Sequence, residues 1–238
     1  MKRFTHFLIA TLAALSFGAH AQEAAIRKNL AERLPSLPKI DEVRPGPIKG
    51  LYEVRVNQSE VFYTDAKGDF LIQGSIIDTQ KRVDLTEERV NKLNAVAFNE
   101  LPLKDAFTIV RGKGTRKLAV FEDPNCSYCK RFERDLAKID DVTIYVFLYP
   151  ILGKDSVEKS RHIWCAKDRA QAFLDWMTDN ATPSAATCDT SAVQRNVDFG
   201  RKVRITGTPT VFFANGTRVP GAIGADQVEA MLKQASAN

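Results

Sequence analysis

The sequence predicts a mixed α/β protein with two domains, a small β-rich segment followed by a larger α/β segment. Short runs of alternating polar and apolar residues fill residues 40–85. Two buried-strand candidates, Leu118–Phe121 and Val142–Leu148, come later, and helical sequence follows each of them. The chain has 44% hydrophobic and 26% charged residues among 238, without a fixed-period repeat, which is ordinary for a globular protein.

Residues 1–21 have the pattern of a secretory signal peptide. Lys2-Arg3 is a basic start, Phe7–Leu15 is an apolar run, and Ala19-His20-Ala21 is a small-x-small cleavage site. The apolar run is shorter than the roughly 20 residues that a transmembrane helix needs. We therefore expect an exported chain that begins at Gln22 and works in an oxidising compartment, where cysteine pairs are chemically active.

The charge of the chain gives little support for binding to nucleic acid. The full sequence has 34 Lys and Arg against 29 Asp and Glu, a net charge of +5. Removal of Lys2 and Arg3 with the signal peptide lowers the net charge to +3. No dense cluster of basic residues remains, so we predict no nucleic-acid partner.

The first domain is expected over residues 22–83. Ile26, Leu30 and Leu34 recur every four residues, which predicts a short amphipathic helix over Ala24–Leu34. Short strands follow, of which Leu51–Val56 alternates most clearly. A segment of this size with so few large apolar side chains would be marginal alone, and association through a sheet edge is one physical remedy.

A linker is expected over residues 84–106 and a second domain over 107–238. Asp84 and Glu87 resemble a capping box, and spaced apolar residues after them predict a helix over Asp84–Leu101. The second domain then contains the two buried strands, a polar helical stretch over 156–204, a β-hairpin and a last helix. The predicted hairpin covers Val211–Val219 and the last helix covers Asp226–Ala235.

The chemistry is concentrated in Cys126-Ser127-Tyr128-Cys129, directly after a predicted strand and at the start of a predicted helix. A cysteine at a helix N-terminus faces the positive end of the helix dipole, which favours the attacking thiolate. This predicts Cys126 as the nucleophile and Cys129 as the resolving thiol. Two alternatives stay open at this point: half of a four-cysteine zinc site with Cys165 and Cys188, and a permanent structural bridge.

A second motif favours disulfide exchange. Thr206-Gly207-Thr208-Pro209-Thr210 directly precedes an apolar strand, where proline is unusual unless it has a positional role such as a cis peptide bond. The order of these features resembles the thioredoxin fold. A strand, the CxxC motif and a helix come first, and a late Thr-Pro, a closing hairpin and a last helix follow.

The resemblance extends to one family, the bacterial periplasmic disulfide isomerases of the DsbC type. It covers nearly the whole mature chain, and residues 71–74 resemble the family's dimerisation domain. The motifs that carry it are, in order, Cys126–Cys129, Ile163–Asp168, Thr206–Pro209 and Asn215–Gly221.

The resemblance implies a periplasmic V-shaped homodimer, in which a linker helix joins the dimerisation domain to a thioredoxin-like domain with a helical insertion. It implies a cis Thr208-Pro209 bond against the CxxC, where Thr208 binds an extended substrate backbone. It also implies a structural disulfide between Cys165 and Cys188. Because Tyr128 lies between the catalytic cysteines, we expect it to be partly exposed and to contact substrate.

The implied activity is the rearrangement of wrong disulfides in misfolded exported proteins through a mixed disulfide. A membrane-linked thiol reductase of the DsbD type restores the dithiol, and neither a cofactor nor a metal is required. The nearest alternative is a DsbG-like reductase and chaperone with a narrower set of clients. A second alternative is a chaperone that works without disulfide chemistry.

The sequence also departs from its relatives. Ser127-Tyr128 replaces the usual Gly-Tyr between the cysteines, which alters the redox potential but not the class of reaction. Thioredoxins carry a buried aspartate six residues before the first cysteine, and this position is Val120 here. Glu122 and Asp123 are the nearest carboxylates, and we assign neither of them a role in proton transfer.

Overall fold

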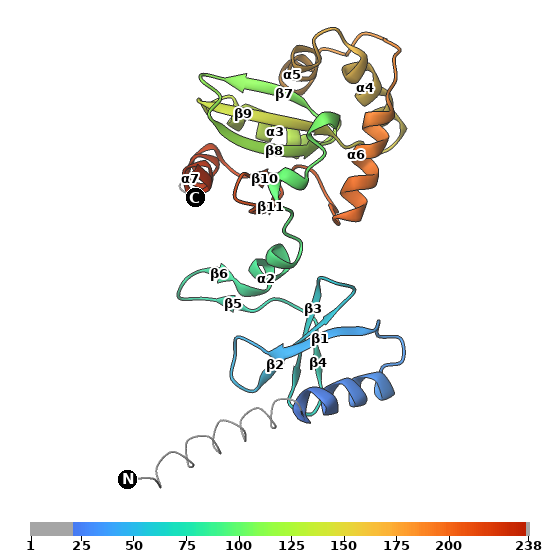
Figure 1. Ribbon diagram of the computed structural model, residues 1–238, viewed down its shortest axis with the longest axis vertical. Helices are drawn as coiled ribbons and strands as arrows, with labels where there is room; N and C mark the ends of the chain where they lie inside the picture. The colour runs from blue at the N-terminus through green and yellow to red at the C-terminus, as the bar shows by residue number, and fades with distance from the viewer. Residues whose placement is uncertain (1–20, 237–238) are drawn as a thin grey trace, which may run out of the picture. The chain divides into compact units, whose positions relative to one another are not determined.

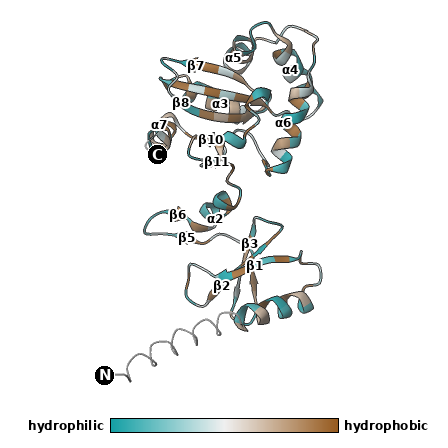
Figure 2. Cartoon of the chain, viewed as in Figure 1, coloured by the Kyte–Doolittle hydropathy of each residue, from teal (hydrophilic) through white to brown (hydrophobic). Residues whose placement is uncertain are grey.

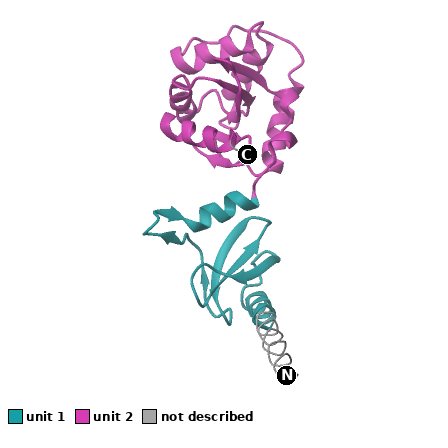
Figure 3. Ribbon diagram, turned by 60° about the vertical axis from the view of Figure 1, so that its left-hand side comes forward, with its two compact units in different colours: residues 1–93 teal, residues 94–238 magenta. Residues whose placement is uncertain are grey.

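The computed structural model describes residues 21–236, which form two compact units. The first unit ends at Leu93 and the second begins at Asn94 (Figure 3). The predicted signal peptide, apart from its last residue, lies outside the described residues. Within residues 21–236, none of the helices has both the length and the apolar character needed to span a membrane.

The first unit pairs a helix over residues 21–33 with a four-stranded antiparallel sheet. In sheet order the strands are β1 (Ile40–Pro45), β2 (Leu51–Val56), β3 (Glu60–Asp65) and β4 (Leu71–Ile72). Ile26 and Leu30 are buried against Val54 and Phe62, as their four-residue spacing predicts. Leu34 lies beyond the end of the helix and is exposed, so the apolar stripe is shorter than expected.

A short hairpin and one helix complete the first unit. These elements are β5 (Ile77–Asp78), β6 (Val83–Asp84) and α2 (Leu85–Leu93). The predicted helix over Asp84–Leu101 is therefore wrong beyond Leu93. The physical reason is tertiary packing, because Val96 and Leu101 are buried in a core of the second unit, on a segment that is not α-helical.

The second unit is built on a five-stranded sheet with the order β11-β10-β8-β9-β7 (Figure 1). The strands are β7 (Phe107–Arg111), β8 (Arg116–Glu122), β9 (Val142–Leu148), β10 (Thr210–Phe213) and β11 (Arg218–Pro220). Strands β8 and β9 run parallel, and the other neighbours are antiparallel. The two buried strands and the closing hairpin are confirmed, whereas the edge strand β7 is not among the predicted strands.

Helices cover both faces of this sheet. They are α3 (Ser127–Leu136), α4 (Lys154–Cys165), α5 (Arg169–Asp179), α6 (Ser191–Lys202) and α7 (Ala225–Ser236), with two short 3-10 turns before β7, η1 (Phe98–Glu100) and η2 (Leu103–Asp105). Leu118 and Val120 of β8 face the core that includes α3, whereas Ala119 and Phe121 face the core that includes α6. The strands are accordingly coloured mainly as hydrophobic (Figure 2). The predicted fold class is confirmed.

Candidate active site

The segment Cys126–Cys129 lies between the carboxyl end of β8 and the first turn of α3. Cys126 is the N-cap of α3, and its carbonyl oxygen accepts a hydrogen bond from the Lys130 N–H at 3.1 Å. Both thiols are free; Cys126 is 6% exposed and Cys129 is fully buried. Of these two cysteines, only Cys126 keeps any exposed surface.

The surroundings of Cys126 lower its pKa to about 5. The largest cause is the hydrogen bond from the Cys129 thiol; burial opposes it, and smaller lowering contributions come from Thr208 and the backbone N–H groups of Cys129 and Tyr128. Burial raises the pKa of Cys129 far above its ordinary value. At neutral pH this combination gives an accessible thiolate beside a protonated thiol.

Thr208 and Pro209 lie against Cys126, although Thr208 is 82 positions away along the chain. The Cys126 thiol donates a hydrogen bond to the Thr208 carbonyl oxygen at 3.2 Å. The peptide bond between Thr208 and Pro209 is cis, as the resemblance implies. The Gly221 N–H donates to the Pro209 carbonyl at 2.8 Å, which ties this turn to the residue that directly follows β11.

Asp123 fixes the loop that carries Cys126. Its fully buried carboxylate accepts hydrogen bonds from the backbone N–H groups of Asn125 at 2.8 Å, Ile151 at 2.7 Å and Leu152 at 2.9 Å. The Ser156 hydroxyl donates to it at 2.7 Å. Asp123 therefore joins the CxxC loop to the loop between β9 and α4, and it acts as a positioning residue.

Exposed apolar side chains lie around this position. Tyr128 is 61% exposed, as expected, and Leu152 and Ile151 are 56% and 38% exposed. Ile151 and Leu152 belong to the loop that Asp123 binds, and the Cys126 N–H donates to the Asp123 carbonyl at 3.0 Å. Apolar surface near the Cys126 thiol thus comes from the first turn of α3 and from the loop between β9 and α4.

The helical insertion between β9 and β10, which includes α5, also contacts the CxxC loop. The indole N–H of Trp176 on α5 donates to the Pro124 carbonyl at 2.5 Å. The Lys130 ammonium lies 3.8 Å from the centre of the Trp176 ring and donates to Asn180 at 2.6 Å. Burial and the nearby charge of Lys159 lower the pKa of Lys130. The cation next to Cys129 is therefore held in place by the insertion.

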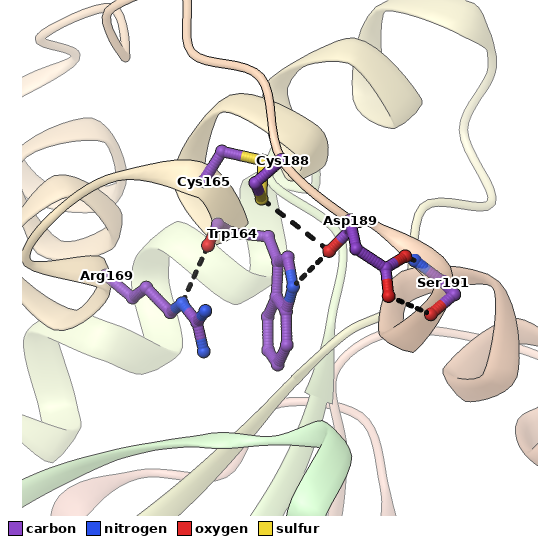
Figure 4. Close-up of a disulfide and its surroundings, with 6 residues drawn as sticks. All are labelled: Trp164, Cys165, Arg169, Cys188, Asp189 and Ser191. Atoms are coloured by element: carbon purple, nitrogen blue, oxygen red, sulfur yellow. Dashed lines mark hydrogen bonds between the residues drawn. A yellow bond between two sulfur atoms is a disulfide. The ribbon is translucent and has the colours of Figure 1, made fainter.

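The other two cysteines are joined to each other. The Cys165–Cys188 bond, with an S–S distance of 2.06 Å, links the end of α4 to the segment before α6 (Figure 4). Beside it, the Trp164 indole donates to the Asp189 carbonyl at 3.1 Å and Arg169 donates to the Trp164 carbonyl at 2.7 Å. Because these two sulfurs are bonded to each other, the structure does not form the four-cysteine zinc site.

Two buried carboxyl groups share the core under the CxxC. Glu122, at the end of β8, and Glu133, on α3, are both fully buried. The sequence contains a local signal for the burial of Glu133. Cys129, Phe132, Glu133 and Leu136 follow the i, i+3, i+4, i+7 spacing of a buried helix face, where a glutamate is out of place.

Comparison with known proteins identifies the relatives of this chain. A thioredoxin-like domain model matches residues 103–236, and the model of the disulfide bond isomerase protein N-terminal domain matches residues 17–87. The probable thiol:disulfide interchange protein DsbC of Bordetella parapertussis is 44% identical over 211 residues, which cover 89% of this chain and 74% of that protein. The chain belongs to the DsbC family.

Other relatives agree with this assignment. The thiol:disulfide interchange protein DsbC of Escherichia coli K12 is 32% identical over 220 residues, covering 90% of this chain and 89% of that protein. The crystal structure of a disulfide interchange protein from Neisseria gonorrhoeae superimposes with a TM-score of 0.54 at 38% identity, covering 57% of this chain and 98% of that chain. This DsbC-family chain is a thiol-disulfide oxidoreductase of the disulfide isomerase type, with a thioredoxin-like domain.

Proposed function

We propose that Cys126 is the nucleophile of this isomerase and that Cys129 is its resolving thiol. The observation that carries the proposal is the accessible Cys126 thiol, with a pKa of about 5, beside a fully buried Cys129. The Cys126 thiolate attacks one sulfur of a wrong disulfide in an exported protein. The substrate S–S bond breaks, a mixed disulfide with Cys126 forms, and the other substrate sulfur leaves as a thiolate.

Two outcomes follow from the mixed disulfide. In isomerisation, a substrate thiolate forms a new substrate disulfide and expels the Cys126 thiolate. In reduction, Cys129 attacks Cys126, the substrate leaves reduced, and the enzyme holds a Cys126–Cys129 disulfide. A membrane-linked reductase of the DsbD type then supplies two electrons that restore the dithiol.

Thr208, Pro209 and Tyr128 position the substrate in this proposal. The Thr208 carbonyl lies 3.2 Å from the Cys126 sulfur, so an extended chain paired with the Thr208 backbone would have its disulfide next to the thiolate. Tyr128, Ile151 and Leu152 offer apolar surface to the exposed hydrophobic residues of an unfolded client.

Two cysteine variants test the proposal. Cys126→Ser removes the nucleophile, and we expect no rearrangement of a substrate protein with scrambled disulfides. Cys129→Ser keeps the nucleophile, so we expect it to retain isomerisation, lose net reduction and accumulate the mixed disulfide on a non-reducing gel. Normal isomerase activity in Cys126→Ser would overturn the assignment.

We also propose that two copies of this chain associate through residues 22–83, with 84–106 as linker and 107–238 as catalytic domain. Strand β4 is an edge of its sheet, and its residue Ile72 is 46% exposed. Phe70, just before β4, and Ile77 of β5 are 71% and 60% exposed. We expect a dimer by light scattering, and Ile72→Glu should shift it to monomer. Val110→Glu, at a 59% exposed position of the second unit, is the matched control.

We further propose that residues 1–21 direct the chain to the periplasm. Basic, apolar and small-residue segments in that order support it. After expression in a Gram-negative host, the periplasmic fraction should hold a protein whose N-terminal residue is Gln22. A full-length chain retained in the cytoplasm would contradict this proposal.

A further inference from the structure

Two carboxyl groups lie buried next to the resolving thiol. Side chains alternate along β8, and Leu118 and Val120 face the core that contains Cys129. Glu122 continues that alternation and pairs with Leu148 of β9, a member of the same core. Glu122 therefore points toward α3 and not toward the opposite face.

Glu133 approaches the same place from α3. It stands four residues after Cys129, so the two side chains lie on one face of the helix, and a helical side chain leans back toward the N-terminus. The two glutamates are fully buried, and none of their four carboxyl oxygens has a hydrogen-bond partner at normal distance among residues 21–236. The side chain of Glu122 is nevertheless close enough to those of Glu133 and Cys129 to interact with both. An isolated carboxylate is expensive to bury in such a core, and two carboxylates are far more so.

The charges around the pair agree with a single shared proton. Burial, and then the charge of Glu133, raise the pKa of Glu122 well above its ordinary value. Burial also raises the pKa of Glu133, while interaction with Glu122 and the charge of Arg111 on β7 lower it. The other titratable groups that act on the pair are the thiols of Cys126 and Cys129. The negative charge of Glu122 in turn raises the pKa of Cys129.

We propose that Glu122 and Glu133 together hold one proton and accept the proton of Cys129 when it resolves the mixed disulfide. This inference rests on the proposed roles of Cys126 and Cys129. It gives Glu122 a role in proton transfer that the sequence alone did not assign to it. The acceptor thus lies at positions other than Val120, where the sequence lacks the buried aspartate of thioredoxins. The Cys129 sulfur has no route to solvent for its proton, because it is fully buried.

In the proposed step, Cys129 loses its proton within the core before it attacks Cys126. The Cys129 S–H proton passes to a Glu122 oxygen, and the proton that the pair already shares stays on Glu133. The Cys129 thiolate attacks the Cys126 sulfur, the Cys126–Cys129 bond forms, and the bond between Cys126 and the substrate breaks. The substrate sulfur leaves as a thiolate and takes a proton from water.

The pair makes this step feasible because the buried charge does not increase. Before the transfer the carboxyl pair carries one negative charge, and after it the Cys129 sulfur carries that charge instead. Deprotonation by an acceptor outside the core would leave two negative charges buried side by side. Such a state is strongly disfavoured in a low-dielectric interior.

Stopped-flow reaction of the reduced enzyme with the aromatic disulfide 5,5′-dithiobis(2-nitrobenzoic acid) separates the two steps. The first thiolate released reports attack by Cys126, and the second reports resolution by Cys129. We expect Glu122→Gln to slow the second phase about 100-fold at neutral pH, the usual contribution of a positioned base, and to leave the first phase within about twofold. Glu133→Gln should slow the same phase. Asp135→Asn, which makes the same charge change at a partly exposed position of α3, should alter neither phase.

The direction of the effect distinguishes proton transfer from simple electrostatics. If the pair only repels the Cys129 thiolate, Glu122→Gln lowers the pKa of Cys129 and the second phase accelerates, which overturns the proposal. If the wild-type enzyme shows no first phase, the assignment of Cys126 as the nucleophile is overturned instead. Should the variants not fold, the wild-type pH profile decides. An internal acceptor predicts a second phase independent of pH near neutrality, whereas a tenfold rise per pH unit would mean that hydroxide is the acceptor.

Discussion

The two cysteine pairs of the second unit differ in a way that exposure alone would not predict. Cys126 and Cys129 are buried and free, whereas Cys188 is exposed and joined to Cys165. Cys126 caps the N-terminus of α3, where the helix dipole stabilises a thiolate. Cys165 is the last residue of α4, at the negative end of a helix, where a thiolate is disfavoured. The place of a cysteine on its helix therefore separates the free pair, which we propose exchanges disulfides, from the bonded pair.

The two cysteine pairs should differ most in their effect on stability, which removal of the bonded pair tests. Cys165→Ala with Cys188→Ala opens a loop with a sequence separation of 23, and loop entropy predicts a loss of about 3 kcal/mol in the free energy of unfolding. The rate of disulfide exchange at 25 °C should stay within about twofold, because Cys126 is untouched. Urea denaturation and an isomerase assay measure the two quantities. A variant of unchanged stability that has lost its activity would reverse the roles of the two pairs.

Reduction should distinguish the two disulfides of the oxidised enzyme next. The Cys126 thiolate stabilises the reduced form of the Cys126–Cys129 pair, since its pKa is about 5 while that of an ordinary cysteine is about 8.5. At pH 7 this ionisation favours the reduced form by a factor of about 100, so Cys126–Cys129 should be reduced at a roughly 100-fold lower ratio of reduced to oxidised dithiothreitol than Cys165–Cys188. Alkylation and peptide mapping after equilibration at successive ratios give both midpoints. Equal midpoints would remove the distinction.

The pH dependence of Cys126 gives a smaller effect. A thiol pKa of about 5 means that the thiolate predominates above that pH and is lost below it. The rate of alkylation by iodoacetamide should therefore be nearly constant from pH 7 to pH 6 and fall about tenfold between pH 6 and pH 4. A midpoint near pH 8.5 would show that the helix N-terminus and the Cys129 hydrogen bond do not act on Cys126.

The smallest expected effect concerns the apolar surface beside Cys126. Tyr128→Ser removes an aromatic side chain that is 61% exposed, so the free energy of unfolding should change little. The KM for an unfolded disulfide substrate should rise about threefold with kcat unchanged, as expected for a contact that binds substrate and transition state equally. Val110→Ser, at another exposed apolar position, serves as the control and should leave KM unchanged.

The parts of the site that the sequence reveals are those with a local chemical signature. Cys126, Cys129, Thr208 and Pro209 belong to short motifs, and the structure brings Thr208 and Pro209 to Cys126. Asp123 escaped assignment because three of the four hydrogen-bond donors to its carboxylate lie 28 to 33 positions further along the chain.

The fold, like the site, is predictable from the sequence only where the signal is local. The central strands follow from their apolar runs, since both of their faces are buried. The end of α2 at Leu93 does not follow from local pattern, because it depends on where Val96 and Leu101 are buried. Glu133 was the one missed group with a local signal, a charged residue within an apolar helical stripe.

The hydrogen bond from Trp176 to the Pro124 carbonyl has a consequence for the evolution of this family. An insertion on a conserved scaffold is usually free to drift, because its residues contact mainly one another. Here one insertion residue contacts the loop before Cys126 and also holds Lys130, which lies next to Cys129. Substitutions at position 176 should therefore occur together with changes at position 130 across homologous chains, because the Lys130 ammonium lies against the Trp176 ring.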